Sequence, residues 1–374
     1  MKKHQIIYLL TMLLATNAFA VELKAMLSPG YDSNPYKLAD NLDNDESFYL
    51  DTNVSLKEIF GKFEITGRLN NRAYEGALDN ADVFSGYMRG RYKTGHQLLN
   101  KKFKSELNVD YGFKDKTYVS RSTGTVGVFS GQKISDRYDY EYWKISGKSA
   151  IQLTKGIKTG LELTFQQKEY DDQNILGLSN LDYEQIGLTN SWKFKQSKAS
   201  SYKLDLSIGE RDFDNKRQKA ISGALIAGSD LKYYFHKLKA SHRHKITKNI
   251  KVDLALKYEE RTDNGSGYYD TEELKLYADI DYKISKGMKA YIDTSYTDRE
   301  YQNNTSSADE NDQDEAGKKG YSIKLGLEKD LMLYESMPVI AFIGAQYDNY
   351  DSNDPIYEYE RYQVFTGVKV EFGR

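Results

Sequence analysis

Strict alternation of apolar and polar residues is the feature that most constrains this chain. Between residues 251 and 259 one residue set is apolar and the other is charged, and residues 274 to 284 repeat the pattern. The first apolar set is Val252, Leu254, Leu256 and Tyr258. Because a β-strand places successive side chains on opposite faces, each such stretch predicts a strand with one apolar and one polar face.

The alternation recurs along the whole chain. The stretches are residues 22–30, 47–58, 62–72, 82–94, 102–116, 137–153, 157–169, 183–195, 201–213, 230–246, 250–262, 271–285, 288–301, 320–330, 337–349 and 357–372. Each is long enough for the ~9–11 residues with which a tilted strand crosses a bilayer. Single-chain outer-membrane barrels have an even number of antiparallel strands. We therefore predict an all-β, transmembrane, antiparallel up-and-down β-barrel of about 16 strands. The pattern is weakest at 137–153 and 230–246.

The predicted connections alternate in length. Those after even-numbered strands are short, as at 60–62, 155–156, 247–249 and 286–287; those after odd-numbered strands are long, as at 117–136, 170–182, 214–229 and 302–319. Lysines gather at the short turns, and aspartates and glutamates gather in the long loops. This arrangement predicts short periplasmic turns, long acidic extracellular loops and both termini in the periplasm.

The first twenty residues have the layout of an export signal. Lys2, Lys3 and His4 precede an apolar run from Ile6 to Leu14, and the segment ends at Ala18-Phe19-Ala20. We expect a cleaved signal peptide at 1–20, a barrel at 21–374 and a location in the cell outer membrane. The alternative, an N-terminal membrane anchor, needs a longer apolar segment.

Composition narrows the function classes. The chain has no Cys, which excludes disulfides, thiolate metal sites and lipid attachment at cysteine. Its net charge of -2 argues against nucleic-acid binding, and 32 Tyr and 15 Phe beside 4 Pro favour β structure. The mean hydropathy of -0.72 is compatible with membrane strands, because their apolar residues alternate with polar ones.

Several alternatives stay open on sequence alone. A soluble β-sandwich alternates in the same way with its apolar face turned inward. His236, His242 and His244 occupy alternate positions of one strand, so they are either metal ligands or a lining or interface feature. The acidic run from Asp309 to Glu315 is a solvated loop or a cation site that bridges lipopolysaccharide phosphates. No G-x-S-x-G, P-loop or H-E-x-x-H motif occurs, so we expect no enzyme and no cofactor, although a hydrolase assembled at the rim is not excluded.

A barrel of this size is too wide for side chains to fill, so the polar face is expected to line an aqueous lumen. Inward Tyr87, Tyr277 and Tyr291 would add flat surfaces for sugar rings. Both charge signs occur, so a strong filter for anions or cations is not predicted. The predicted lining residues are Arg68, Arg89, Arg91, Glu106, Asn108, Asp110, Glu162, Asp205, Arg211, Asp253, Lys257, Glu259, Asp279, Asp281, Asp293 and Lys324.

Three short motifs resemble a known family. They are Tyr31-Asp32-Ser33-Asn34-Pro35-Tyr36 after the first strand, Arg211-Asp212-Phe213-Asp214, and Gly267-Tyr268-Tyr269-Asp270. They are similar to segments of the β-barrel porin type 2 proteins and related barrels found with exopolysaccharide secretion systems. The resemblance implies passage or export of a polysaccharide across the outer membrane.

The expected partners follow from these features. The last segment ends in alternate residues from Tyr362 to Phe372, which resembles the C-terminal signal read by the barrel-assembly machinery, although Gly373-Arg374 follow it. Outer-membrane lipid and lipopolysaccharide would surround the barrel, and a basic periplasmic rim would attract an anionic polysaccharide handed over by export components. The alternative function is a structural or adhesive barrel that uses its acidic loops.

Overall fold

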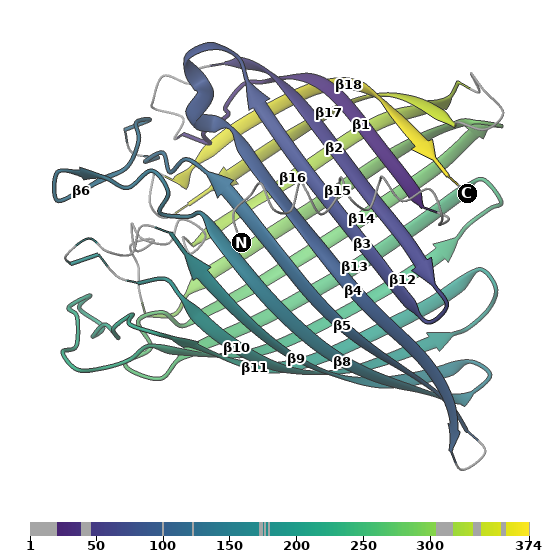
Figure 1. The fold of residues 1–374 in the computed structure, drawn as a ribbon, viewed down its shortest axis with the longest axis horizontal. Helices are drawn as coiled ribbons and strands as arrows, with labels where there is room; N and C mark the ends of the chain where they lie inside the picture. The colour runs from purple at the N-terminus through teal and green to yellow at the C-terminus, as the bar shows by residue number, and fades with distance from the viewer. Residues whose placement is uncertain are drawn as a thin grey trace.

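The computed structural model shows long strands closed into one barrel (Figure 1). It describes residues 21–38, 46–98, 101–121, 123–171, 175, 177–178, 180–303, 317–331, 338–352 and 357–373. The predicted signal peptide and the acidic run from Asp309 to Glu315 lie outside these residues. No helix of the described residues is long and apolar enough to cross a membrane.

Sixteen strands form the wall, and each pairs antiparallel with its neighbour along the chain. The first and last strands, β1 and β18, pair with each other and close the barrel. The strands are β1 (Glu22–Asp32), β2 (Ser47–Phe60), β3 (Phe63–Tyr74), β4 (Val83–Leu98), β5 (Lys101–Lys116), β8 (Tyr140–Thr154), β9 (Ile157–Tyr170), β10 (Tyr183–Lys195), β11 (Ser200–Phe213), β12 (Lys232–Lys245), β13 (Ile250–Asp263), β14 (Thr271–Ser285), β15 (Met288–Tyr301), β16 (Lys318–Asp330), β17 (Val339–Asp351) and β18 (Tyr359–Phe372).

The predicted fold class is confirmed, and all sixteen predicted segments coincide with barrel strands to within a few residues. Three short elements within the connections were not predicted: a 3₁₀ helix η1 (Gly76–Ala81) and the hairpin strands β6 (Val128–Phe129) and β7 (Gln132–Lys133). Strand β8 begins later than predicted because residues 134–139 form consecutive turns, in which Arg137 N–H donates to the Ile134 carbonyl and Asp139 N–H to the Asp136 carbonyl.

The burial pattern of this barrel is the reverse of that of a soluble β protein. Leu161 and Leu163 on β9 are 53% and 56% exposed, whereas Asp110, on the opposite face of β5 from Leu107 and Val109, is 3% exposed. The apolar set therefore covers the outside and the polar set faces the lumen. This excludes the β-sandwich, which turns its apolar face inward.

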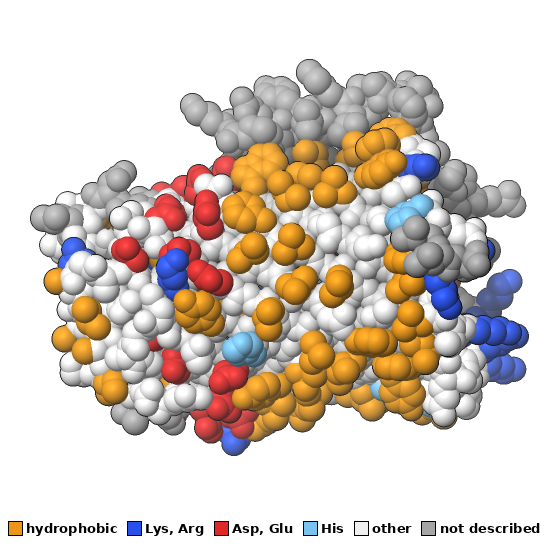
Figure 2. All heavy atoms as spheres, turned by 90° about the horizontal axis from the view of Figure 1, so that it is seen from below, with side chains coloured by type: hydrophobic (Ala, Val, Ile, Leu, Met, Phe, Trp, Pro, Cys, Tyr) orange, Lys and Arg blue, Asp and Glu red, His pale blue; other side chains and the backbone are white. Residues whose placement is uncertain are grey.

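The two ends of the barrel differ. One end carries tight turns such as 155–156 and 286–287, and the other carries connections such as 117–139 and 214–231; we call them the short-turn end and the long-loop end. Figure 2 shows acidic side chains toward the long-loop end, basic side chains at the short-turn end and an apolar belt between them. The buried hydrophobic clusters lie toward the long-loop end, where connections pack on the barrel mouth.

Candidate functional site

The lumen wall is the candidate functional site, and strand register decides which side chains form it. Residues paired across neighbouring strands share a face. Asp110 pairs with Arg89 and Lys144, and Asp293 pairs with Asp279 and Lys324, so these side chains lie on one face. Extending the register around the barrel places all sixteen predicted lining residues on the inward face. Their role in permeation stays a prediction.

Most inward charges are paired within the wall. Arg91 reaches Glu64 at 3.1 Å and Glu106 at 3.4 Å, and Lys148 reaches Glu162 at 3.2 Å. Because these cations lie beside a carboxylate on a neighbouring strand or two residues away on their own strand, the wall is a lattice of ion pairs. Further members are Arg89–Asp110, Lys203–Asp205, Lys237–Glu259, Lys257–Glu259 and Arg243–Asp253.

The lattice is densest on β13 to β15. Glu273 contacts Lys257 at 3.3 Å, Lys275 at 3.0 Å and Arg299. Toward the short-turn end, Asp281 contacts Lys289 at 3.3 Å and Lys251 at 3.4 Å. Glu273 was not among the predicted lining residues, although it follows the same alternation as Lys275 and Tyr277 and lies with them on the inward face.

Some of the predicted lining residues have no counter-charge. Asp279 and Asp293 face each other across β14 and β15, and neither forms an ion pair within the described residues. Lys324 lies over the Phe365 ring, 5.0 Å from its centroid. Arg68 donates from Nε to Asn70 Oδ1 at 3.0 Å and remains exposed. These groups are the charges of the wall that a solute in the lumen would meet.

Inward tyrosines pack against glycines of the neighbouring strand. Tyr291 covers Gly326, and Tyr142 covers Gly112; a Cβ at either glycine would clash with the ring. Tyr291 was predicted as a sugar platform, together with Tyr87 and Tyr277, and all three face inward. Tyr142 was missed because its stretch had the weakest alternation.

The Tyr31–Tyr36 motif forms the seam between β1 and β18. The Asp32 carboxylate accepts hydrogen bonds from Arg361 Nε at 2.8 Å, Gln363 Nε2 at 2.8 Å and the Tyr74 hydroxyl at 2.8 Å. Asn34 is 1% exposed and donates from Nδ2 to the Leu38 and Glu360 carbonyls. The motif therefore has a structural role: it joins the first loop to the last strand.

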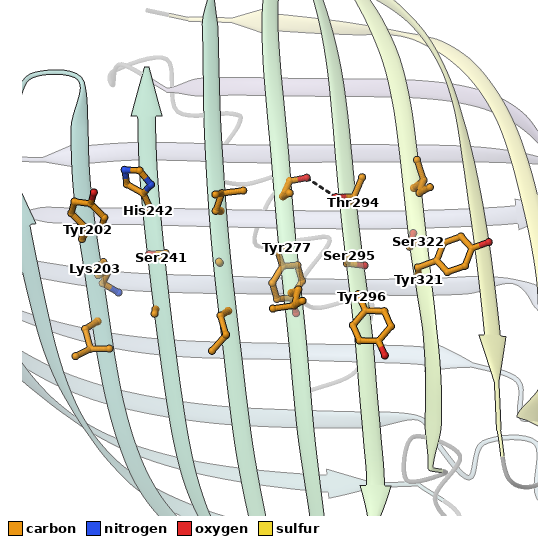
Figure 3. A pocket seen from close by; sticks show the side chains of 18 of the residues that line it. Tyr202, Lys203, Ser241, His242, Tyr277, Thr294, Ser295, Tyr296, Tyr321 and Ser322 are labelled. Carbon is orange, nitrogen blue, oxygen red and sulfur yellow. Dashed lines mark hydrogen bonds between the residues drawn. The ribbon is translucent and has the colours of Figure 1, made fainter. Parts of the chain in front are cut away.

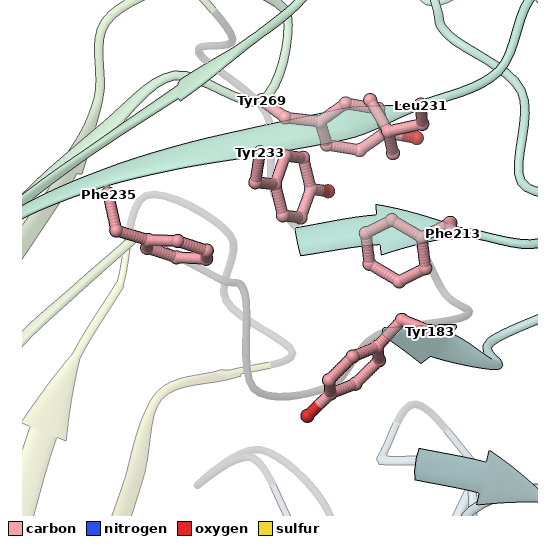
Figure 4. Packing of buried hydrophobic residues seen from close by; sticks show 6 residues of the cluster. All are labelled: Tyr183, Phe213, Leu231, Tyr233, Phe235 and Tyr269. Atoms are coloured by element: carbon pink, nitrogen blue, oxygen red, sulfur yellow. The ribbon is translucent and has the colours of Figure 1, made fainter. Parts of the chain in front are cut away.

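The other two motifs belong to an inward aromatic cluster at the long-loop end (Figure 4). The cluster comprises Tyr183, Phe213, Leu231, Tyr233, Phe235 and Tyr269. Arg211 lies over the rings of Tyr183 and Phe235, 4.2 Å and 5.1 Å from their centroids, and donates to Gln185 at 3.1 Å. Its charge is held against aromatic faces, so it differs from the freely exposed Arg68.

The three histidines on β12 face outward, so of the alternatives left open by the sequence a lining of the lumen is wrong. His242 pairs with Tyr202, and His236 pairs with Ile208, both on the outward face. His236 Nδ1 lies 3.6 Å from the Glu260 carboxylate. No group of three possible metal ligands occurs among the described residues.

A shallow hollow also lies on the outside of the barrel. Figure 3 shows part of it, with the Thr294 hydroxyl donating to the Ala278 carbonyl at 3.0 Å. Small outward residues such as Ala240 and Ala278 leave this hollow of about 770 Å³ among larger apolar side chains, so it lies on the outer face of the barrel and not in the lumen.

A Ser200–His242 pair, with Oγ and Nε2 3.0 Å apart, lies on the same outer face. Ser200 is 7% exposed, and within the described residues no carboxylate contacts the His242 ring. The pair therefore lacks the third group that orients the histidine of a hydrolytic triad.

Solved structures match almost the whole length of this chain at low sequence identity. A structure described as a bacterial polysaccharide outer membrane secretin superposes with a TM-score of 0.42 at 11% identity, covering 95% of this chain and 98% of that one. The outer membrane protein OprD from Pseudomonas aeruginosa gives 0.47 at 10% identity, covering 96% of each chain. OccAB1 from Acinetobacter baumannii gives 0.46 at 10% identity, covering 94% of this chain and 96% of that one. No protein-family model and no curated protein matches the sequence.

Proposed function

We propose that this protein is an outer-membrane channel through which a polysaccharide passes. The observation that carries the proposal is the reversed burial pattern. Charged and hydroxylic side chains line the inside of the sixteen-strand wall, and leucines and isoleucines cover its outside. Such a wall suits water inside and hydrocarbon outside.

Two features of the lumen favour a sugar polymer as the solute. The inward rings of Tyr142 and Tyr291 cover glycines of the neighbouring strand, and aromatic rings at the wall offer apolar surface on which a sugar ring can rest without a deep pocket. Paired charges and amides around them offer hydrogen bonds to hydroxyl groups at many successive positions. A long polar chain can therefore exchange one set of weak contacts for the next as it moves.

The basic short-turn end favours an anionic polymer. Its turns carry lysines, among them Lys62, Lys155, Lys198, Lys248 and Lys286. Figure 2 shows basic side chains gathered at this end. A ring of positive charge at a channel entrance raises the local concentration of an anionic solute. If this end faces the periplasm, its positive charge favours entry of an anionic polymer from the periplasm, which is the direction that export requires.

Planar lipid bilayers test the channel directly. The purified barrel should give stepwise conductance, and polysaccharides should interrupt that current from the side of the short-turn end at lower concentration than from the opposite side. A barrel that inserts but carries no current would contradict the proposal. Equal block from both sides would contradict the direction.

A further inference from the structure

A cavity of about 520 Å³ lies inside the barrel at its long-loop end. Strands β2 to β5 form its wall, and the connections that follow β1 and β5 cover it through residues such as Lys37 and Arg121. Its volume lies within the range of about 300–1,000 Å³ typical of small-ligand sites. We call it the basic cavity.

The charge of the basic cavity is strongly one-sided. Seven Lys and Arg side chains line it, and Asp51 is the only carboxylate among the described lining residues. Asp51 is already bound by Arg72, whose Nε and Nη2 each donate to it at 2.7 Å. Arg361 is likewise bound by the buried Asp32. Of the remaining five cations, four form no ion pair with a carboxylate of the described residues: Lys37, Arg68, Lys114 and Arg121.

Three of these five cations are placed to meet a ligand. Arg68 is exposed to the cavity, and its Nε donates a hydrogen bond to Asn70 Oδ1. The Arg121 guanidinium lies 5.4 Å from the Tyr357 ring centroid, and the Lys37 ammonium lies 5.6 Å from that of Tyr359. None of the three forms an ion pair within the described part of the chain. A guanidinium presents a planar fork of donors that matches a carboxylate.

Neutral hydrogen-bonding groups continue from Arg68 across the wall. Asn53 on β2 contacts Asn70 on β3, and Asn70 Nδ2 lies 3.5 Å from the Ser85 hydroxyl on β4. Amides and hydroxyls both donate and accept, as sugar hydroxyls do. The cavity thus combines concentrated positive charge with a neighbouring row of groups suited to a polyol.

We propose that the basic cavity is a binding site for a carboxylate-bearing sugar unit, with Arg68 and Arg121 holding the carboxylate and Asn53 and Asn70 binding hydroxyls. The proposal rests on the proposed function, because a polymer that passes the lumen would present such units in succession. The polymer that passes the channel is then an acidic polysaccharide.

The test compares block of single-channel current by oligogalacturonate, by a neutral malto-oligosaccharide of equal length and by inorganic phosphate. The variants are the double substitution Arg68→Gln with Arg121→Gln, and Lys239→Gln as the matched control. Lys239 is an inward, exposed lysine on β12, which lies nearly opposite β3 in the strand order. Each variant must insert and conduct, which shows that the barrel has folded.

The native channel should be blocked by oligogalacturonate at roughly 10-fold lower concentration than by the neutral oligosaccharide, a difference of about 1.4 kcal/mol, because only the acidic sugar forms charge-assisted hydrogen bonds with the arginines. The double variant should lose this difference, and Lys239→Gln should keep it. Equal block by the acidic and neutral sugars, equal loss in the control, or block by phosphate as strong as by oligogalacturonate would each overturn the inference. A native barrel without current would instead overturn the proposed function.

Discussion

Two regions face each other across the long-loop end, and both hold inward cations. In the aromatic cluster on β10 to β13, Arg211, Arg261 and Lys216 lie over rings, and Lys216 is 1% exposed. In the basic cavity on β2 to β5, Arg68 has no ring or carboxylate against it and remains exposed. The same alternation in sequence therefore produces packing on one side and an open charged surface on the other. An inward position alone does not identify a residue that meets a solute.

The largest expected effect is a loss of folding stability when a buried side chain of the aromatic cluster is removed. Tyr233 is 0% exposed and packs edge-on against Phe213 and Tyr269. Tyr233→Ala should lower the free energy of unfolding by about 3–5 kcal/mol, because it removes a large buried ring. Urea unfolding from lipid vesicles, followed by fluorescence of the two tryptophans, measures the loss.

The matched control for Tyr233 is its neighbour in sequence. Tyr234 points outward and is 39% exposed, so Tyr234→Ala should cost clearly less. Both variants should keep the native preference for acidic over neutral oligosaccharides. Equal losses of stability would show that the aromatic cluster does not hold this part of the wall.

The next effect concerns the seam beside the basic cavity. Asp32 is 0% exposed, and its carboxylate accepts hydrogen bonds from Arg361, Gln363 and Tyr74. Asp32→Asn should lower the free energy of unfolding by about 1–3 kcal/mol, because one or more buried donors lose their acceptor. Unfolding midpoints in urea measure this change.

Glu371 provides the control on the same pair of strands. It lies 2.9 Å from Lys24, and both side chains are about one-third exposed or more. Glu371→Gln should change stability by roughly 0–1 kcal/mol, as surface ion pairs do. If the two variants unfold at the same urea concentration, the seam does not depend on the Asp32 network.

The same contrast shows which features the sequence predicted and which it did not. Alternation fixes the face of each side chain, so the strands and the inward position of residues such as Asp110 and Arg89 followed directly. Packing between distant connections leaves no periodic signal, so the aromatic cluster and the basic cavity were not foreseen. The Tyr31–Tyr36 motif was noticed, but its role depends on Arg361, which lies more than three hundred residues away in sequence.

The smallest expected effect is a pH dependence of the preference for acidic oligosaccharides, which arises from Lys37 in the basic cavity. Burial, together with repulsion from Arg361, Arg121, Lys318 and Lys116, lowers the pKa of Lys37 from 10.5 to about 7. Because the pKa in the folded protein lies below its ordinary value, Lys37 loses its charge as the pH rises through about 7. The folded state is therefore stabilised as the pH increases from about 7 to 10.5, since only the unfolded chain then keeps the proton.

In the channel, Lys37 should add a positive charge to the cavity at pH 6 and little at pH 8. The preference for oligogalacturonate over the neutral oligosaccharide should be modestly stronger at pH 6, as measured by block of single-channel current. Lys37→Gln should make this preference the same at both values. The histidines His96, His236, His242 and His244 all lie on the outward face and do not line the cavity. A pH dependence that persists in Lys37→Gln would show that another group controls the charge of the cavity.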